Sequence, residues 1–374
     1  MAATASQLGS IVALGGFALA FVFGAVANRT NFCTMGAVSD VVNMGSWGRM
    51  RMWLLAIAVA ILGTHALQLA GLIDLSRSFY VRPNFTWLSY ILGGFLFGVG
   101  MTLGSGCGSK TLVRMGGGSL KSLIVFVFLG LAAYMTLKGL FAIWRQDTLD
   151  RVAADLNAVH VPRQDLPTLI SALTGASLPA VELAVAVAVA GALLVFVFKD
   201  RDFRASFDHI LGGTVVGLVI VGGWYVTGHI GFAENPDTLE ETFFGTNSRA
   251  IESLSFTAPV GYALELLMLW SDQSLRVTFG IAATVGIIAG SFAYAIASRT
   301  FRWEGLSGAE DTANHIVGGI LMGFGGVTAL GCTIGQGLTG FSTLALGSIL
   351  AFLAIVAGSA LTMKFQYWRM TREG

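Results

Sequence analysis

Charged residues are scarce in this sequence. Of its 374 residues, only 11% are Asp, Glu, Lys or Arg, while 55% are hydrophobic, and the mean hydropathy is +0.74. A soluble domain carries about 25% charged residues. The deficit runs along the whole chain, so it excludes a soluble globular protein and indicates a polytopic membrane protein. The net charge of +1 gives no information about a polyanionic partner, and we expect no nucleic-acid partner.

Cysteine is rarer still, with three residues at distant positions. Their spacing contains no CxxC pair, which excludes a disulfide framework and a zinc-finger type of metal site. The sequence also lacks a Walker motif, a dinucleotide-binding fingerprint and a Ser-His-Asp set. We therefore expect no catalytic residues, no metal and no cofactor, and we expect that the protein is not an enzyme.

Long apolar runs and 49 glycines make up much of the chain. A helix needs about 20 apolar residues to span a bilayer, and small residues let membrane helices pack closely. We expect an all-α polytopic membrane protein, embedded in the lipid bilayer as a single membrane domain, with about nine transmembrane helices plus short re-entrant helices. The expected spans are 9–27, 53–73, 87–103, 121–143, 180–198, 209–226, 276–297, 313–330 and 344–364, and the apolar stretch 256–270 is expected to be a short re-entrant or interfacial helix.

The distribution of Lys and Arg favours one orientation of these spans. Nine spans put the two termini on opposite sides. With the C-terminus inside, the inner segments hold 14 Lys and Arg residues and the outer segments hold 6. The positive-inside rule therefore predicts a multi-pass cell-membrane protein with its N-terminus outside and its C-terminus in the cytoplasm. The long loops 144–179 and 228–255 then fall outside.

Two segments of the chain match each other. Residues 93–108 align with residues 318–333 at a constant offset of 225, with seven identities in sixteen positions, among them Cys107 with Cys332. The third span runs inward and the eighth outward, so we expect two inverted-topology repeats, about 9–143 and about 209–364, joined by a linker helix at about 180–198. Transporters commonly use this architecture, with sites on broken helices near the midplane. The alternative is a chance match between two glycine-rich helices.

Each cysteine stands in a short polar patch between apolar runs. The patches read Asn31-Phe32-Cys33-Thr34-Met35-Gly36, Gly104-Ser105-Gly106-Cys107-Gly108-Ser109 and Leu330-Gly331-Cys332-Thr333-Ile334-Gly335. Broken backbone at membrane depth is tolerated only where it is buried in protein or lines a wet cavity. The patches therefore predict helix breaks along a path through the bilayer.

The chemistry of these breaks favours a small anion. A break exposes the N–H groups of a helix N-terminus, which carry partial positive charge. A free thiol is mostly protonated at neutral pH, and it adds a weak donor and a polarizable sulfur. We infer a ligand with soft sulfur or selenium atoms. Two alternatives remain at this point: the cysteines only fill space between helices, or the three thiols bind a metal.

These strings resemble the YeeE/YedE family of bacterial inner-membrane proteins, over nearly the whole chain. The middle motif continues through Lys110, Leu112-Val113-Arg114 and Gly116-Gly117-Gly118-Ser119-Leu120-Lys121-Ser122-Leu123, and the last runs on to Gln336-Gly337. The resemblance implies uptake of thiosulfate or a related small anion through a path lined by the three motif cysteines, with short re-entrant helices pointing at the centre. It also implies a cytoplasmic TusA-like sulfur-carrier protein as partner.

The candidate substrate-binding residues come from these patches: Cys33, Cys107, Cys332, Asn31, Thr34, Gly106, Gly331, Thr333, Gln336 and Lys110. For Asp40, in the first patch, we expect a helix cap or a gate that repels anions. Two other functions stay open. One is transport of another sulfur or selenium species. The other is a membrane sulfurtransferase that relays sulfane sulfur as a cysteine persulfide, which needs a thiolate beside a base or cation, and Lys110 near Cys107 is the candidate cation.

Overall fold

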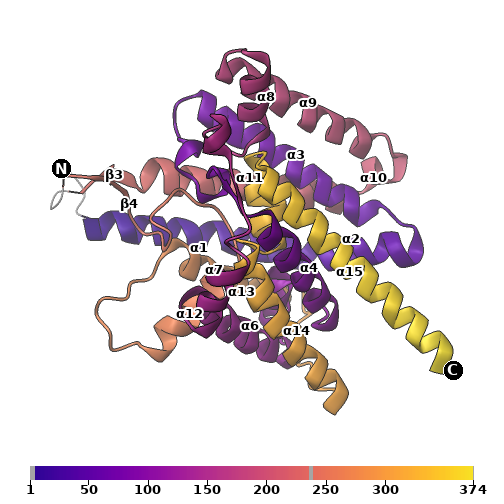
Figure 1. Cartoon of the computed structure of the whole chain (residues 1–374). Helices are drawn as coiled ribbons and strands as arrows, with labels where there is room; N and C mark the ends of the chain where they lie inside the picture. Colours follow the sequence, from indigo (N-terminus) through magenta and orange to yellow (C-terminus); the bar gives the residue numbers. More distant parts are fainter. Residues whose placement is uncertain (1–4, 236–238, 374) are drawn as a thin grey trace.

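The computed structural model describes residues 5–235 and 239–373 as a helical bundle (Figure 1). Eight helical segments of the described chain are long and apolar enough to cross a membrane, which confirms the expected all-α polytopic membrane protein. Their main helices are α1 (Ala5–Thr30), α3 (Gly48–Leu69), α4 (Trp87–Leu103), α6 (Leu120–Lys138), α9 (Leu178–Phe198), α11 (Phe207–Tyr225), α13 (Phe279–Ala297) and α15 (Leu346–Glu373).

The ninth expected span is the helix α14 (Ala309–Thr328), which is less apolar than the eight. It carries Glu310 and Asp311 in its first turn, and Asp311 pairs with Lys121 across a distance of 2.8 Å. A charged first turn lowers the hydropathy of a helix whose remainder is rich in glycine. The segment is thus helical where the sequence predicted it, and its start is polar.

Short helices follow the long ones at the three predicted breaks. They are α2 (Thr34–Ser39) with the π-helix η1 (Asp40–Met44), α5 (Gly108–Gly116) and the π-helix η6 (Gly335–Gly340). Two more short helices lie elsewhere: the π-helix η5 (Val226–Ile230) continues from α11, and α12 (Ala258–Met268) is the expected short apolar helix. The loops carry α7 (Leu140–Thr148), α8 (Leu166–Thr174), α10 (Arg201–Ala205) and the 3-10 turns η2 (Leu75–Arg77), η3 (Phe79–Val81) and η4 (Leu156–Val159).

Two small antiparallel pairs tie the loops together. The strand β1 (Asn84–Phe85) pairs with β2 (Ala154–Asp155), with Asn84 opposite Asp155, and β3 (Phe232–Glu234) pairs with β4 (Glu241–Phe243), with Phe232 opposite Phe243. Ser78 also bridges to Ile251. The loops that follow α3, α6 and α11 are therefore joined to one another, and β3 and β4 lie at the end of the molecule that carries the N-terminus, away from the C-terminus (Figure 1).

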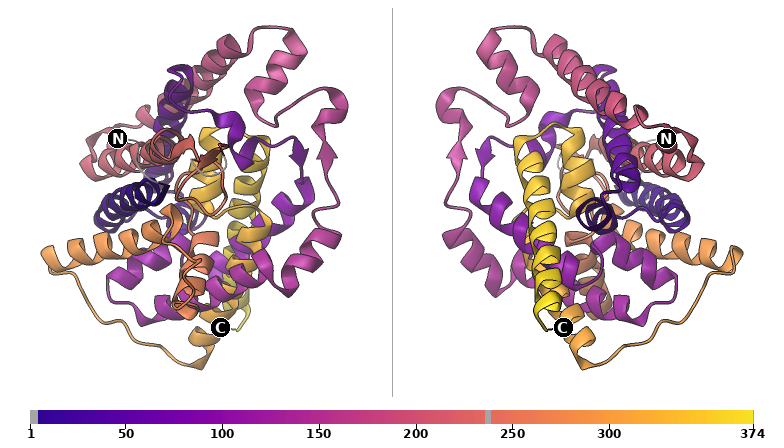
Figure 2. Two further views of the ribbon diagram at one scale, coloured as in Figure 1. Left: turned by 90° about the vertical axis from the view of Figure 1, so that its left-hand side faces the viewer. Right: turned by 90° about the vertical axis from the view of Figure 1, so that its right-hand side faces the viewer.

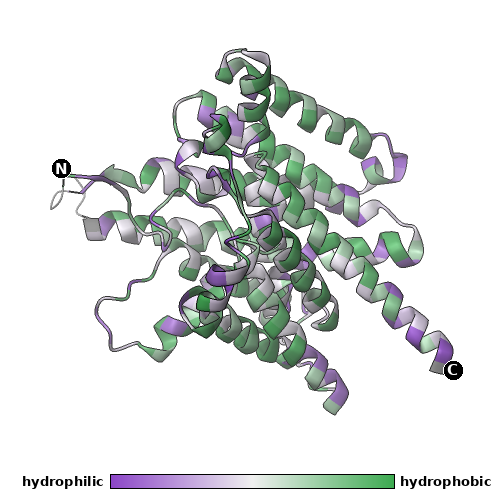
Figure 3. Ribbon diagram, viewed as in Figure 1, coloured by the Kyte–Doolittle hydropathy of each residue, from purple (hydrophilic) through white to green (hydrophobic). Residues whose placement is uncertain are grey.

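The long helices pack in a paired pattern. α1 lies against α13 and α11 against α3, while α4 lies against α15 and α14 against α6; α4 and α14 also meet each other. α8 and α9 stand at the edge of the bundle (Figures 1 and 2). Most residues of the helices are hydrophobic, and hydrophilic ones gather at helix ends and in loops (Figure 3). This distribution suits a bundle surrounded by lipid.

Glycines set the contact between α4 and α14. A Cβ added at Gly93 would lie 2.7 Å from the carbonyl oxygen of Gly325, and one added at Gly325 would lie 2.5 Å from that of Gly93. Gly100 and Gly318 make the same reciprocal contact, at 2.7 Å in each direction. Any side chain here would strike backbone, so only glycine lets the two helices approach this closely.

A cysteine-lined site at three helix breaks

The three predicted breaks share one backbone geometry. The residue two positions before each cysteine is a non-glycine residue in the left-handed region: Asn31 (φ 52°), Ser105 (φ 56°) and Leu330 (φ 59°). The next N–H then donates to the carbonyl five residues back: Phe32 to Ala27 at 3.2 Å, Gly106 to Met101 at 2.9 Å and Gly331 to Gly326 at 2.7 Å. This bond is the signature of a Schellman stop. Each cysteine therefore follows a sharply ended helix and leads into a short one.

The three breaks bring the three thiols together. The side chains of Cys33 and Cys107 interact directly, and Cys332 lies within electrostatic range of Cys107. All three are free and buried, with exposed fractions of 5%, 0% and 0% for Cys33, Cys107 and Cys332. Since most of the chain separates the first from the last, the convergence comes from the packing of the bundle and not from local sequence.

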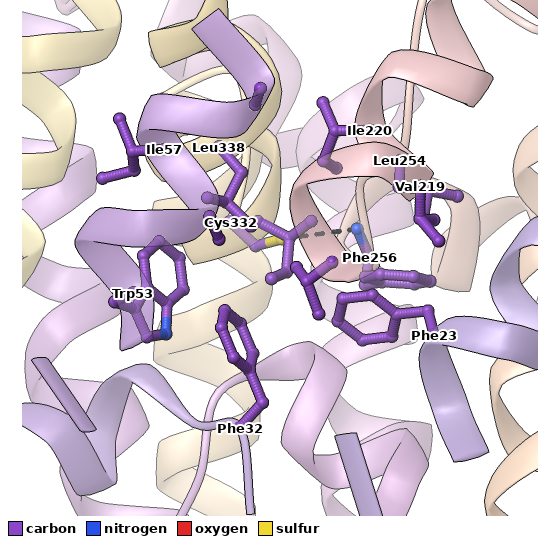
Figure 4. Packing of buried hydrophobic residues seen from close by; sticks show 14 of the residues in the cluster. Phe23, Phe32, Trp53, Ile57, Val219, Ile220, Leu254, Phe256, Cys332 and Leu338 are labelled. Atoms are coloured by element: carbon purple, nitrogen blue, oxygen red, sulfur yellow. Dashed lines mark hydrogen bonds between the residues drawn. The ribbon is translucent and has the colours of Figure 1, made fainter. Parts of the chain in front are cut away.

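Each sulfur is oriented by neighbouring polar groups. Gly36 N–H donates to the Cys33 sulfur at 3.3 Å, and the Cys107 sulfur lies 3.3 Å from the Ser109 hydroxyl. Cys332 accepts from the N–H of Phe256 at 3.3 Å, drawn as a dashed line in Figure 4, and from the N–H of Gly335 at 3.4 Å. These bonds fix the position of each sulfur in the site.

Several buried polar atoms around the thiols have no hydrogen-bond partner among the described residues. They are the hydroxyls of Thr34, Thr257 and Thr333, the indole N–H of Trp53 and the side-chain oxygen of Gln336. Thr333 also approaches Cys107, while the Gln336 amide nitrogen donates to the carbonyl of Ala329. Native proteins pair nearly all such groups, and an unpaired buried one costs about 1–3 kcal/mol. The three hydroxyls and the indole N–H are donors that an anion would satisfy, whereas the Gln336 oxygen is an acceptor.

Apolar side chains enclose the site. Figure 4 shows Phe23, Phe32, Trp53 and Phe256 around Cys332, and Trp53 stacks on Phe32 with 5.2 Å between ring centroids. A hydrogen bond in such low-dielectric surroundings is electrostatically stronger than one in water. The thiols and hydroxyls are therefore effective donors here even though each is weak or neutral in itself.

Lys110 and Asn31 lie at the mouth of the site rather than among the thiols. The Lys110 ammonium donates to the Asn31 side-chain oxygen at 3.4 Å, and both residues line an open hollow of about 480 Å³ together with Arg114 and Arg302. Arg114 also donates to the Ser105 carbonyl at 3.0 Å. Lys110 remains within electrostatic range of Cys33, so this basic mouth lies beside the first two breaks. Glu304 also lines the hollow, where its carboxylate lies 3.5 Å from the Arg114 guanidinium.

Asp40 is the C-cap residue of the short helix α2, where its backbone N–H donates to the carbonyls of Gly36 and Ala37, and its side chain is engaged elsewhere. Its carboxylate accepts from two nitrogens of the Arg49 guanidinium, because the chain turns back between η1 and α3. A Cβ at Gly36 would strike the same guanidinium. Neutralised by this pair, Asp40 is also a poor source of repulsion for an anion.

Phe256, Thr257 and Trp53 belong to the site, although no motif marked them. Phe256 and Thr257 directly precede α12. The Phe256 N–H donates to Cys332 from outside its own break, and the Thr257 hydroxyl lies against Gly326 of α14. An apolar residue followed by Thr before a short helix is only a weak sequence signal of a binding site. Trp53 lies within a predicted span, where nothing in the sequence distinguishes it from other apolar residues. Within the described ranges, no group of three or more His, Cys, Asp or Glu side chains is arranged to hold a metal ion.

The broken helices and their buried polar centre define a polytopic membrane protein with the architecture that transporters use for substrate sites. Residues 29–361 match the model of the family described as "Sulphur transport". The chain belongs to this family, which confirms the resemblance seen in its motifs.

Two relatives are similar over almost their whole length. The thiosulfate transporter TsuA of Escherichia coli K12 is 27% identical over 336 residues, which cover 87% of this chain and 86% of that protein. The thiosulfate transporter TsuA of Spirochaeta thermophila is 26% identical over 348 residues, which cover 92% of this chain and 96% of that protein.

Proposed function

We propose that this protein takes up thiosulfate, or a closely related sulfur anion, across the bacterial inner membrane. Its family membership and its relatives support sulfur-anion transport. The observation that carries the finer proposal is the cluster of three converging thiols with unpaired hydroxyl and indole donors around them. An anion dehydrated in this site would regain its hydrogen bonds from neutral donors.

The donors suit the two ends of thiosulfate differently. Hydroxyls and the Trp53 N–H are good donors to its oxygens, while the polarizable thiols match its terminal sulfur. Neutral donors also bind weakly enough for release, because a fixed cation in this low-dielectric centre would hold a dianion far more strongly. Transport requires binding that permits both entry and exit.

The proposed path runs between two inverted repeats. The repeat offset of 225 relates Gly93 to Gly318 and Gly100 to Gly325. It therefore converts the contact Gly93–Gly325 into the contact Gly100–Gly318, as expected for a pseudo-two-fold axis between α4 and α14. The packing of α1 on α13 likewise corresponds to that of α11 on α3. With the N-terminus outside, the loops of β3 and β4 form the outer face, α9 links the repeats, and the basic mouth opens inward.

We expect the transported anion to leave the protein through the basic mouth on the inner side. Lys110, Arg114 and Arg302 line it, and such a patch attracts anions and acidic protein surfaces. We place a TusA-like sulfur carrier, the partner implied by the motifs, against this mouth in the cytoplasm.

Uptake of intact thiosulfate tests the proposed function. A strain that lacks its own uptake systems and expresses this protein should grow on thiosulfate as sole sulfur source. Membrane vesicles should accumulate both labels of thiosulfate that is labelled differently at its two sulfurs. Accumulation of one label alone would contradict a permease and point to the persulfide relay instead. Inhibition by a selenium or other sulfur anion at lower concentration than thiosulfate would reassign the substrate.

The unpaired hydroxyls give a second test. Thr333→Val removes a buried donor without changing shape, so we expect an unfolding free energy that is equal or higher, since an unpaired group is replaced by an apolar one. The same variant should raise the KM for thiosulfate about tenfold, because a hydrogen bond to a charged group contributes about 1.5 kcal/mol or more. Transport kinetics and thermal unfolding in detergent measure the two effects.

Thr136→Val is the matched control. Thr136 is equally buried, but its hydroxyl donates to the Ala132 carbonyl within α6 at 2.7 Å. We expect an unchanged KM for this variant. If Thr333→Val instead lowers stability and leaves KM unaltered, the Thr333 hydroxyl serves the fold and not the anion.

A further inference from the structure

A second cavity, of about 180 Å³, lies on the outer side of the cysteine site. Its wall includes Gly331, which directly precedes Cys332, and Ser255, which precedes Phe256. The Ser255 hydroxyl lies 2.6 Å from the position of a Cβ at Gly335, and Gly335 and Phe256 both donate to the Cys332 sulfur. The cavity therefore ends against the break that carries Cys332, as an outer vestibule of the proposed path would.

The wall of this cavity also contains a carboxylate, Glu252. Its backbone is fixed by Thr227 of η5, whose hydroxyl accepts from the Glu252 N–H at 3.2 Å and donates to the Glu252 carbonyl. Its carboxylate accepts from the Ser248 hydroxyl. Among the described residues, no Lys, Arg or His lies within ion-pair distance of it. A rigidly held carboxylate without a neighbouring cation is unexpected in the wall of an anion path, because its ionised form repels anions.

A fixed negative charge in this position would repel a dianion strongly, because both would share a poorly hydrated space. We propose that Glu252 is a proton-binding site linked to the transported anion: its carboxylate takes up a proton from the outer solution as the anion enters the cavity, and it releases the proton when the anion has left. This inference rests on the proposed function, since it assumes that an anion passes the cavity.

The surroundings of Glu252 suit this role. Burial raises the pKa of Glu252 to about 7, against a smaller lowering by the hydrogen bond from Ser248. The titratable groups that face it are Tyr80 of η3 and Tyr262 of α12, and phenols stay neutral at this pH. A raised acid pKa means that Glu252 is mostly neutral at pH 6 and mostly ionised at pH 8. Thiosulfate itself is a dianion at both.

The pH dependence of uptake is the first test. The neutral fraction of a group with a pKa near 7 falls about tenfold between pH 6 and pH 8, so initial uptake at low thiosulfate concentration should fall by a similar factor in the wild type. Glu252→Gln keeps the size and a neutral side chain, and its uptake should stay nearly constant over this range. Glu241→Gln, in the exposed strand β4 on the same face, should keep the wild-type profile.

Calorimetry of thiosulfate binding in two buffers of different ionisation heat gives an independent test on the wild type alone. Linkage between the two ligands is reciprocal, so at pH 8 we expect uptake of about one proton for each thiosulfate bound, and almost none at pH 6. This measurement decides the question even if Glu252→Gln does not fold.

The outcomes separate the two proposals. Uptake that is present but equal at pH 6 and pH 8, or a wild-type profile retained by Glu252→Gln, would overturn the role of Glu252 and leave the thiosulfate path intact. Binding without proton uptake at pH 8 would do the same. Wild-type protein that neither binds nor transports thiosulfate at any pH would overturn the proposed function, and this inference with it.

Discussion

Cys107→Ala should reduce thiosulfate uptake by about 10- to 100-fold, the loss expected when a hydrogen bond to a charged group worth about 1.5–3 kcal/mol is removed. Cys107 has the largest expected effect of the three cysteines because its sulfur lies at the centre, in contact with Cys33, Ser109 and Thr333. Initial uptake rates in vesicles, normalised to the amount of folded protein, measure the effect.

Cys107→Ser is the matched comparison. It retains a donor at nearly the same place but loses the polarizable sulfur, so we expect activity between that of the wild type and that of the alanine variant. Thermal unfolding should show that both variants remain folded, since a small side chain is exchanged for a small one. Equal uptake by wild type and Cys107→Ala would remove the thiol from the transport path.

Gly290→Val should lose most of the folded protein. Gly290 on α13 faces α1 so closely that an added Cβ would overlap the Phe21 carbonyl oxygen. One turn further along, a Cβ added at Gly24 of α1 would overlap the Ile287 carbonyl oxygen of α13. Overpacking of a rigid contact typically costs about 1–3 kcal/mol of folding free energy and occasionally more. Here the clash is with backbone atoms, which cannot be relieved by a change of side-chain rotamer. α1 ends at the first cysteine break, so its displacement would also move Cys33.

The matched control for this substitution is Gly191→Val. Gly191 on α9 has no atom within 4 Å of an added Cβ, so the same change of side chain meets open space. We expect normal yield and an unfolding temperature close to that of the wild type. Comparable destabilisation by both substitutions would mean that helix propensity, and not the contact between α1 and α13, determines the effect.

Much of the helical framework could be predicted from hydropathy alone. The predicted span 87–103 coincides with α4, because Thr86 and Gly104 bound an uninterrupted apolar run. α15 extends to Glu373, past the predicted end at 364. The last turns of this helix are polar, and a span predicted from hydropathy ends where the apolar residues end. Whether α14 spans the membrane is harder to decide from hydropathy, because its acidic first turn lowers the mean hydropathy of a helix whose remainder is apolar.

The site could be predicted in part. The polar patches located all three breaks, since short stretches rich in glycine and threonine between apolar runs interrupt a membrane helix. No local pattern could show that Phe256 reaches Cys332, because that contact depends on how a long loop returns into the bundle. The pairing of Asp40 with Arg49 was missed for a similar reason: it forms across a turn whose direction the sequence does not specify.

In the proposed orientation, the two hollows open toward opposite sides of the membrane, with the cysteine breaks between them. The outer cavity reaches Gly331, next to Cys332, and the inner hollow reaches Asn31 and Lys110, close in sequence to Cys33 and Cys107. If the solutions on the two sides fill these hollows, the membrane voltage falls mainly across the cysteine layer. A dianion moving inward against 100 mV then meets about 4.6 kcal/mol there, twice the value for one charge. The proton that we propose for Glu252 stays in the outer cavity, so it lowers the repulsion at the entrance and leaves this electrical work unchanged.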